Sequence, residues 1–145
     1  MKTYSMLIFF TGKGEPIGYS SGVIRSRAEG QIISTVDRPG ITGEAVLQSP
    51  AAAARFDTVV TVLGDQSWES GRVTFEAINS HLDVVTGIPG KIYPQENGTV
   101  TGSISWRVTG GSGLFAGASG LVTGNFVGYA DDTFTDHQLF KLVLP

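Results

Sequence analysis

The sequence predicts an all-β fold, a small closed antiparallel β-barrel of about eight strands. Two observations support it: segments rich in β-branched and aromatic residues recur along the 145 residues, and turn residues separate them. Antiparallel strands leave exposed edges unless the sheet closes, and eight strands enclose an interior wide enough for side chains or one small ligand. A two-sheet sandwich is the alternative, because periodicity does not distinguish open from closed sheets.

The first half of the chain contains five predicted strands and one short predicted helical turn. The Pro39-Gly40 pair is typical of a turn between two strands. The helical turn is predicted near residues 50–55, where Ser49 can cap, Pro50 suits the first helical position and four alanines follow. The predicted strands of this half cover residues 2–10, 17–27, 31–36, 41–47 and 56–63.

The second half contains the clearest strand of the chain. Asn97-Gly98 is a strong hairpin signal. After it, hydrophobic and small residues alternate with polar ones from Thr99 to Val108, which predicts one buried and one solvent-facing side. The remaining predicted strands cover residues 71–79, 82–86, 121–130 and 137–144.

Length and composition limit the organisation of the chain and its partners. At this length, with 41% hydrophobic and 16% charged residues, we expect one globular domain over residues 1–145. The net charge is -3 and no basic block occurs, so we expect no nucleic-acid partner. No apolar run reaches the length of a membrane-spanning helix, and the N-terminus lacks a signal-peptide pattern, so we expect a cytoplasmic protein without a membrane partner.

The absence of cysteine excludes disulfides, thiolate catalysis and iron–sulfur or cysteine-ligated zinc sites. With only His81 and His137 as imidazoles, a histidine-rich metal site in one chain is excluded as well. A Ser-His-Asp triad would need one of these histidines beside an activated serine, and no Gly-x-Ser-x-Gly motif is present. We therefore expect no cofactor and no metal site.

Residues 98–120, GTVTGSISWRVTGGSGLFAGASG, combine the alternating strand with a glycine-rich turn, an aromatic residue and a second glycine pair. Gly110, Gly111 and Gly113 permit a tight connection, and Phe115 can close one end of a barrel. This segment resembles the corresponding turn of the allene oxide cyclase-like barrel superfamily, which includes the dirigent proteins and bacterial spirotetronate cyclases. The resemblance implies the barrel fold and does not identify a catalytic residue.

Four aromatic residues are the predicted substrate-binding set, because they fall on buried-face positions and would wall an apolar interior. They are Phe75, Trp106, Phe126 and Tyr129. The plain alternative for each is an ordinary core residue. Polar contacts to a ligand would come from Tyr4, Tyr19, Tyr129 or Arg25 only if their strands turn these side chains inward.

The densest polar cluster comprises Asp131, Asp132, Asp136 and His137. Its oxygen ligands would suit calcium or magnesium, but its spacing matches no known loop, so the sequence favours a solvated turn with a surface histidine at the barrel rim. A carboxylate pair could also be drawn from Glu44, Glu69, Glu76 and this cluster, although Glu76 alternates with Phe75 and should face water.

The first functional hypothesis is a small-molecule cyclase or isomerase that holds a hydrophobic substrate inside the barrel and selects one reactive conformer by shape. The second is a non-catalytic binding protein that uses the interior as lipocalins do, and the third is an assembly module with a filled interior. Apolar residues on both faces of 58–63 and 139–144 suggest a homodimer or homotrimer.

Overall fold

The computed structural model describes residues 1–19, 22–37, 43–47 and 53–145, with side chains given outside 34–37 and 43–47. Extended strands dominate it, and its only helical elements in these ranges are two short 3-10 turns, η2 and η3. The elements are β1 (Lys2–Pro16), β2 (Val23–Asp37), β3 (Gly43–Leu47), β4 (Ala53–Leu63), β5 (Gln66–Phe75), η2 (Glu76–Ile78), β6 (Ser80–Thr86), β7 (Gly90–Pro94), β8 (Val100–Ser112), η3 (Gly113–Phe115), β9 (Ser119–Gly128) and β10 (Thr133–Leu144).

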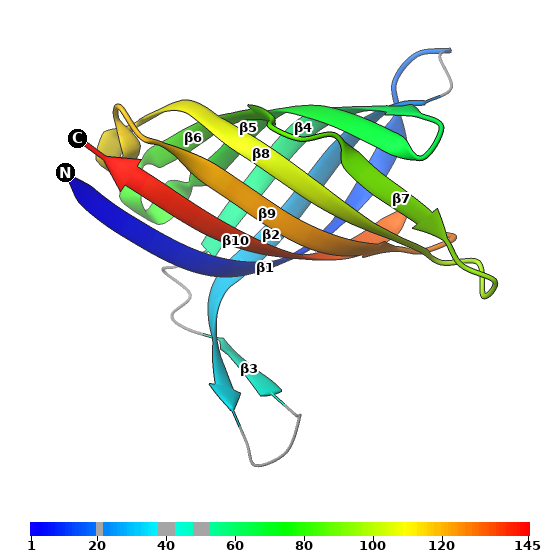
Figure 1. Ribbon diagram of the computed structural model, residues 1–145, viewed down its shortest axis with the longest axis horizontal. Coiled ribbons are helices and arrows are strands. Elements are labelled where there is room, and N and C mark those ends of the chain that lie inside the picture. The colour runs from blue at the N-terminus through cyan, green and yellow to red at the C-terminus, as the bar shows by residue number, and fades with distance from the viewer. Residues whose placement is uncertain (20–21, 38–42, 48–52) are drawn as a thin grey trace.

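Eight of these strands close into an antiparallel barrel, as the sequence predicted. They follow the order β1-β10-β9-β8-β6-β5-β4-β2, and β2 pairs with β1 to complete the circle. The closing pairing excludes an open two-sheet sandwich. Figure 1 shows that β3 lies outside the barrel, where it pairs with β2 below the wall. The short strand β7 pairs with β5 and β8 at one end.

The barrel has two different ends. Lys2 pairs with Leu144 at the end that carries both termini, and η3 lies beside them (Figure 1). There Phe115 is buried and its ring lies 5.1 Å from that of Phe75, so the predicted closure by Phe115 is confirmed. At the opposite end, Lys13 pairs with Thr133.

The helical turn predicted near 50–55 is wrong for its last three residues, which belong to β4. Residues 48–52 lie outside the described part of the chain. Ala54 pairs with Gly30 and is buried, while its neighbours on either side are exposed. The period-2 burial and the pairing with β2 override the helix propensity of alanine, because tertiary packing is worth more than propensity over so short a run.

The predicted break between strands 17–27 and 31–36 is also wrong, because β2 runs through it from Val23 to Asp37. The described residues before Val23 in the first predicted strand are not extended strand. Gly30, which lies between the two predicted strands, is part of β2, and a Cβ there would come within 2.6 Å of the Phe10 ring. The glycine therefore makes room for a core aromatic and does not end the strand.

Two sequence predictions in the second half are confirmed. Gln95 and Thr99 are joined by a backbone hydrogen bond across the Asn97-Gly98 turn, and Gly98 adopts a φ of 82°. In β8, Gly102, Ile104, Trp106 and Val108 are buried and alternate with less buried residues.

Candidate functional site

A cavity of about 310 Å³ opens inside the barrel at the end away from the termini. Its rim includes the exposed residues Tyr129 and Asp132, and its inner part includes the carboxyl groups of Glu69 and Asp136. Between them lie mainly apolar side chains. The lining residues are Gly14, Pro16, Ile24, Ser26, Phe56, Val60, Val62, Ser67, Glu69, Ile92, Val100, Ile104, Phe126, Gly128, Tyr129, Asp132, Thr133, Phe134 and Asp136.

Glu69 is held at the cavity wall by two neutral donors. The hydroxyl of Thr58 on β4 donates to Oε1 across 2.6 Å, and the indole N–H of Trp106 on β8 donates to Oε2 across 2.9 Å. Burial raises the pKa of Glu69, and these two hydrogen bonds oppose that rise because they stabilise the charged form. Both carboxylate oxygens accept a donor, which is the pattern of an ionised carboxylate.

Asp136 lies on β10 and is 3% exposed. The side-chain amide of Gln138 donates to its Oδ2 across 2.7 Å. Desolvation raises the pKa of Asp136 to about 7, and the negative charge of Glu69 adds to this rise. Oδ1 of Asp136 and Oε1 of Gln138 have no hydrogen-bond partner among the described residues.

Two inward-facing glycines on β8 and β9 create space for these side chains. A Cβ on Gly124 would lie 2.9 Å from Oδ1 of Asp136, and a Cβ on Gly102 would lie 2.2 Å from the Phe126 ring. A larger residue at either position would displace the side chain opposite it. The cavity therefore depends on glycine as much as on its polar residues.

The four predicted substrate-binding residues do not lie together. Phe126 and Tyr129 line the cavity. Trp106 is buried, supports Glu69 through its N–H and packs edge-on against Phe56 at 5.5 Å. Phe75 lies at the closed end against Phe115 and does not line this cavity.

The other residues predicted to offer polar contacts to a ligand, Tyr4, Tyr19 and Arg25, do not line the cavity. Tyr19 is fully exposed, and Tyr4 packs against the hydrophobic core. Arg25 points outward and forms a bidentate pair with Asp57, with its shorter contact at 2.6 Å. This pair raises the pKa of the arginine and lowers that of the carboxyl.

The expected solvated cluster at 131–137 is correct for three residues and wrong for Asp136. Asp131, Asp132 and His137 are exposed, and His137 packs beside Phe9 with 4.7 Å between ring centroids. Asp136 points inward because it shares the strand parity of Phe140 and Leu142, which are buried. That parity is the sequence signal that would have identified it.

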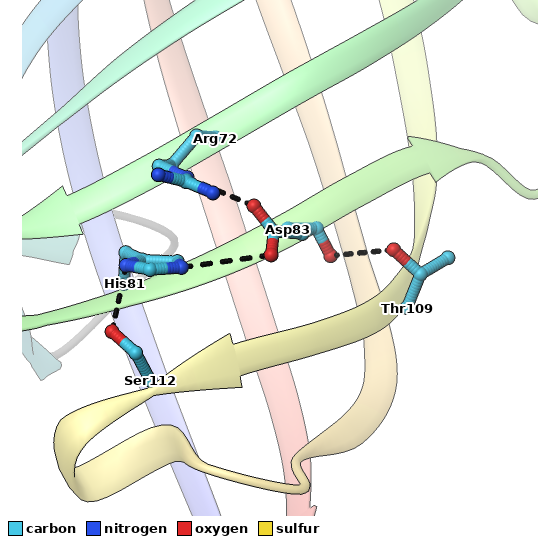
Figure 2. Close-up of polar contacts among 5 residues, drawn as sticks. All are labelled: Arg72, His81, Asp83, Thr109 and Ser112. Atoms are coloured by element: carbon cyan, nitrogen blue, oxygen red, sulfur yellow. Dashed lines mark hydrogen bonds and ion pairs between the residues drawn. The ribbon is translucent and has the colours of Figure 1, made fainter.

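A second polar cluster lies on the outer face of the barrel (Figure 2). Oγ of Ser112 lies 2.7 Å from Nδ1 of His81, and Nε2 of His81 lies 3.5 Å from Oδ2 of Asp83. The other Asp83 oxygen accepts from Arg72 across 2.8 Å, and its backbone oxygen accepts from Thr109 across 3.2 Å.

This outer cluster contains the Ser, His and Asp residue types of a catalytic triad, but Asp83 is already paired with Arg72. The side chains of this cluster connect β5, β6 and β8, next to the irregular pairing of β6 with β8 at Asp83 and Val84. We therefore interpret it as a cross-strand contact that stabilises the wall.

Two further features bear on site chemistry. Within the ranges the structure describes, no group of three or more His, Cys, Asp or Glu side chains is arranged to hold a metal ion. No helix in those ranges has the length and apolar character to cross a membrane.

Comparisons with known proteins connect this barrel to one described fold. No protein-family model matches the chain, and no curated protein matches it. Among solved structures, it is similar to the pterocarpan synthase dirigent protein GePTS1, with a TM-score of 0.50 and 12% sequence identity over 99% of this chain and 87% of that one. At this identity the likeness is one of fold, and the fold of this chain is that of a dirigent-like β-barrel.

Proposed function

We propose that the barrel binds a small apolar molecule in the Glu69–Asp136 cavity and directs its cyclisation or isomerisation. The observation that supports this most is the position of two carboxyl groups with raised pKa values at the inner end of a mainly apolar cavity. Titratable groups with shifted pKa values in a cleft are typical of sites that transfer protons.

The two carboxyl groups would have different roles. Asp136, with a pKa of about 7, can exchange a proton with a substrate oxygen or carbon near neutral pH, as an acid when it is protonated and as a base when it is ionised. Glu69, bonded as a carboxylate, would stabilise the positive charge that the protonated substrate develops. The proton that Asp136 gives or takes in the first step is exchanged back in the second, so the product is an isomer of the substrate.

The cavity walls would select the reactive conformer. Phe56 and Phe134 stack with 6.0 Å between centroids, and Phe126 and Ile104 line the cavity with them. Such walls restrict a flexible substrate and exclude water from the carboxyl pair.

The fold likeness and the Gly110–Gly120 segment also lead us to infer membership of the allene oxide cyclase-like and dirigent superfamily.

The test uses a pair of variants on neighbouring residues of β4. Val60 lines the cavity, whereas Val59 points outward and is 44% exposed. Small unsaturated alcohols and ketones are screened by thermal shift against the full chain. We expect Val60→Phe to abolish the shifts and Val59→Phe to preserve them.

Each compound that binds is then incubated with the protein and analysed by chiral chromatography and mass spectrometry. We expect products of unchanged mass with the natural chain and none with Asp136→Asn. Recovery of every bound compound unchanged would contradict catalysis and support the non-catalytic binding protein. Shifts that survive Val60→Phe would contradict binding in this cavity.

A further inference from the structure

The charges at the inner end of the cavity are unbalanced. Two carboxyl groups, those of Glu69 and Asp136, line it, and the lining residues in the described part of the chain include no Lys, Arg or His. Their hydrogen-bond donors are a hydroxyl, an indole N–H and an amide, which are all neutral. Buried carboxylates in proteins are normally paired with a cation, and here the described lining residues supply none.

The hydrogen bonds around Asp136 also leave oxygen atoms without a partner. Asp136 and Gln138 are 3% and 0% exposed, yet each keeps one oxygen without a partner. When Asp136 is ionised, both unpartnered atoms are acceptors, and the one on Asp136 belongs to a residue that lines the cavity. Since buried polar atoms are nearly always satisfied, the missing group is a hydrogen-bond donor. The terminal torsion of aspartate is soft, so this carboxyl can turn its free oxygen toward a donor in the cavity.

The rest of the cavity wall favours a ligand that has an apolar body and a positively charged end. Phe56, Phe126 and Phe134 present aromatic surface near the carboxyl groups, and aromatic faces attract cations. An anionic ligand would meet two carboxyl groups and no counter-charge, which disfavours it. A neutral ligand would leave the charge imbalance in place.

We propose that the substrate or ligand of this cavity is an apolar molecule carrying a protonated amine, and that the ammonium group donates hydrogen bonds to Glu69 and Asp136. This proposal rests on the proposed function, because it assigns a chemical class to the molecule bound in the same cavity. A charge-assisted hydrogen bond to a carboxylate is stronger than one between neutral groups, so the amine should be the main source of affinity.

Binding of a cation should also release a proton. The titratable groups at the cavity are Glu69, Asp136, Asp132 and Tyr129, while the strands on either side of β10 place Gly124, Phe126 and Phe10 against Asp136. Asp136 has a pKa of about 7 and is mostly protonated at pH 6. An ammonium group lowers this pKa, so amine binding at pH 6 should release close to one proton and at pH 8 almost none.

The test is isothermal titration calorimetry of the full chain with three matched probes, phenethylamine, phenethyl alcohol and hydrocinnamate. We expect the amine to bind about tenfold more tightly than the alcohol at pH 8, and hydrocinnamate to bind more weakly than both. Repeating the amine titration at pH 6 in buffers of different ionisation enthalpy measures the released proton.

Three variants separate the cavity from the charge. Glu69→Gln should weaken the amine about tenfold and leave the alcohol unchanged. The control, Glu96→Gln, changes an exposed carboxyl that does not line the cavity and should alter amine binding less than about twofold. Val60→Phe should abolish binding of both probes.

Equal affinities for amine and alcohol in the natural chain would overturn the amine proposal and leave the proposed function standing. That comparison needs no variant, so a misfolded Glu69→Gln protein does not prevent the test. Absence of binding by both probes, or binding that Val60→Phe does not change, would count against the amine proposal and against this cavity as the binding site.

Discussion

The indole N–H of Trp106 on β8 lies 2.9 Å from Oε2 of Glu69 on β5, so a core aromatic orients a carboxylate of the candidate site from two strands away in the same sheet. Thr58 holds the other oxygen from β4. Trp106 was predicted to contact substrate directly. The structure gives it a positioning contact beneath the cavity, while its ring packs edge-on against Phe56, which lines the cavity.

Trp106→Phe should lower the free energy of unfolding by about 1–3 kcal/mol, because it preserves the aromatic ring but leaves a buried carboxylate oxygen without its donor. It should also raise the pKa of Glu69. Urea unfolding measures the first effect. The control is Trp68→Phe, the same change at a residue that is 38% exposed. Equal losses of unfolding free energy in the two variants would show that the hydrogen bond from Trp106 to Glu69 does not stabilise the fold.

The contribution of Asp136 to the stability of the protein should fall as the pH rises from about 4 to about 7. Folding raises the pKa of Asp136 from 3.8 to about 7, so the folded chain holds this proton more tightly. The resulting stability is complete below the unfolded pKa and is lost as the pH rises through the folded pKa. Its size is at most about 4 kcal/mol for a shift of about three pH units.

Asp136→Asn removes this titration, so its unfolding free energy should match that of the natural chain near pH 4 and exceed it above pH 7. Asp57 and Asp131, whose lowered pKa values act in the opposite direction, are present in both proteins and cancel in the difference. The measurement is urea unfolding at a series of pH values. Parallel curves would show that Asp136 titrates near its ordinary value in the folded chain.

Gly102→Ala should destabilise the barrel by about 1–3 kcal/mol through overpacking, because the new methyl group would lie 2.2 Å from the Phe126 ring. The displaced ring should also weaken binding of phenethyl alcohol. Gly110→Ala on the same strand is the control, since a Cβ there meets nothing within 4 Å. Thermal unfolding and calorimetry measure the two effects, and similar behaviour of both variants would refute this account.

Phe115→Ala should destabilise the protein by about 3–5 kcal/mol, because it removes the buried ring that packs on Phe75 at the closed end. Ligand affinity in the folded variant should not change, since the cavity opens at the other end. Leu114→Ala removes the adjacent side chain, which is 51% exposed, and should cost far less. A loss of affinity comparable to that of Val60→Phe would mean that the two ends of the barrel are coupled.

The sequence determined most of the local structure. Period-2 alternation identified the buried face of β8, the Asn97-Gly98 pair identified its hairpin, and the Gly110–Gly120 segment predicted both the barrel and its closure by Phe115. These features depend on neighbouring residues, because turn geometry and side-chain alternation are local properties of the backbone. The alanine run failed as a predictor because its pairing partner, β2, lies far away in the chain.

Only the tertiary structure decided the candidate site. Glu69 and Asp136 come from β5 and β10, and neither is near the other in sequence. Alternation with Phe140 and Leu142 can place Asp136 on the inward side of its strand, but it does not show which residues of other strands share that part of the interior. The sheet register brings the two carboxyl groups into one cavity, and that register follows from non-local pairings such as β1 with β2 and β1 with β10.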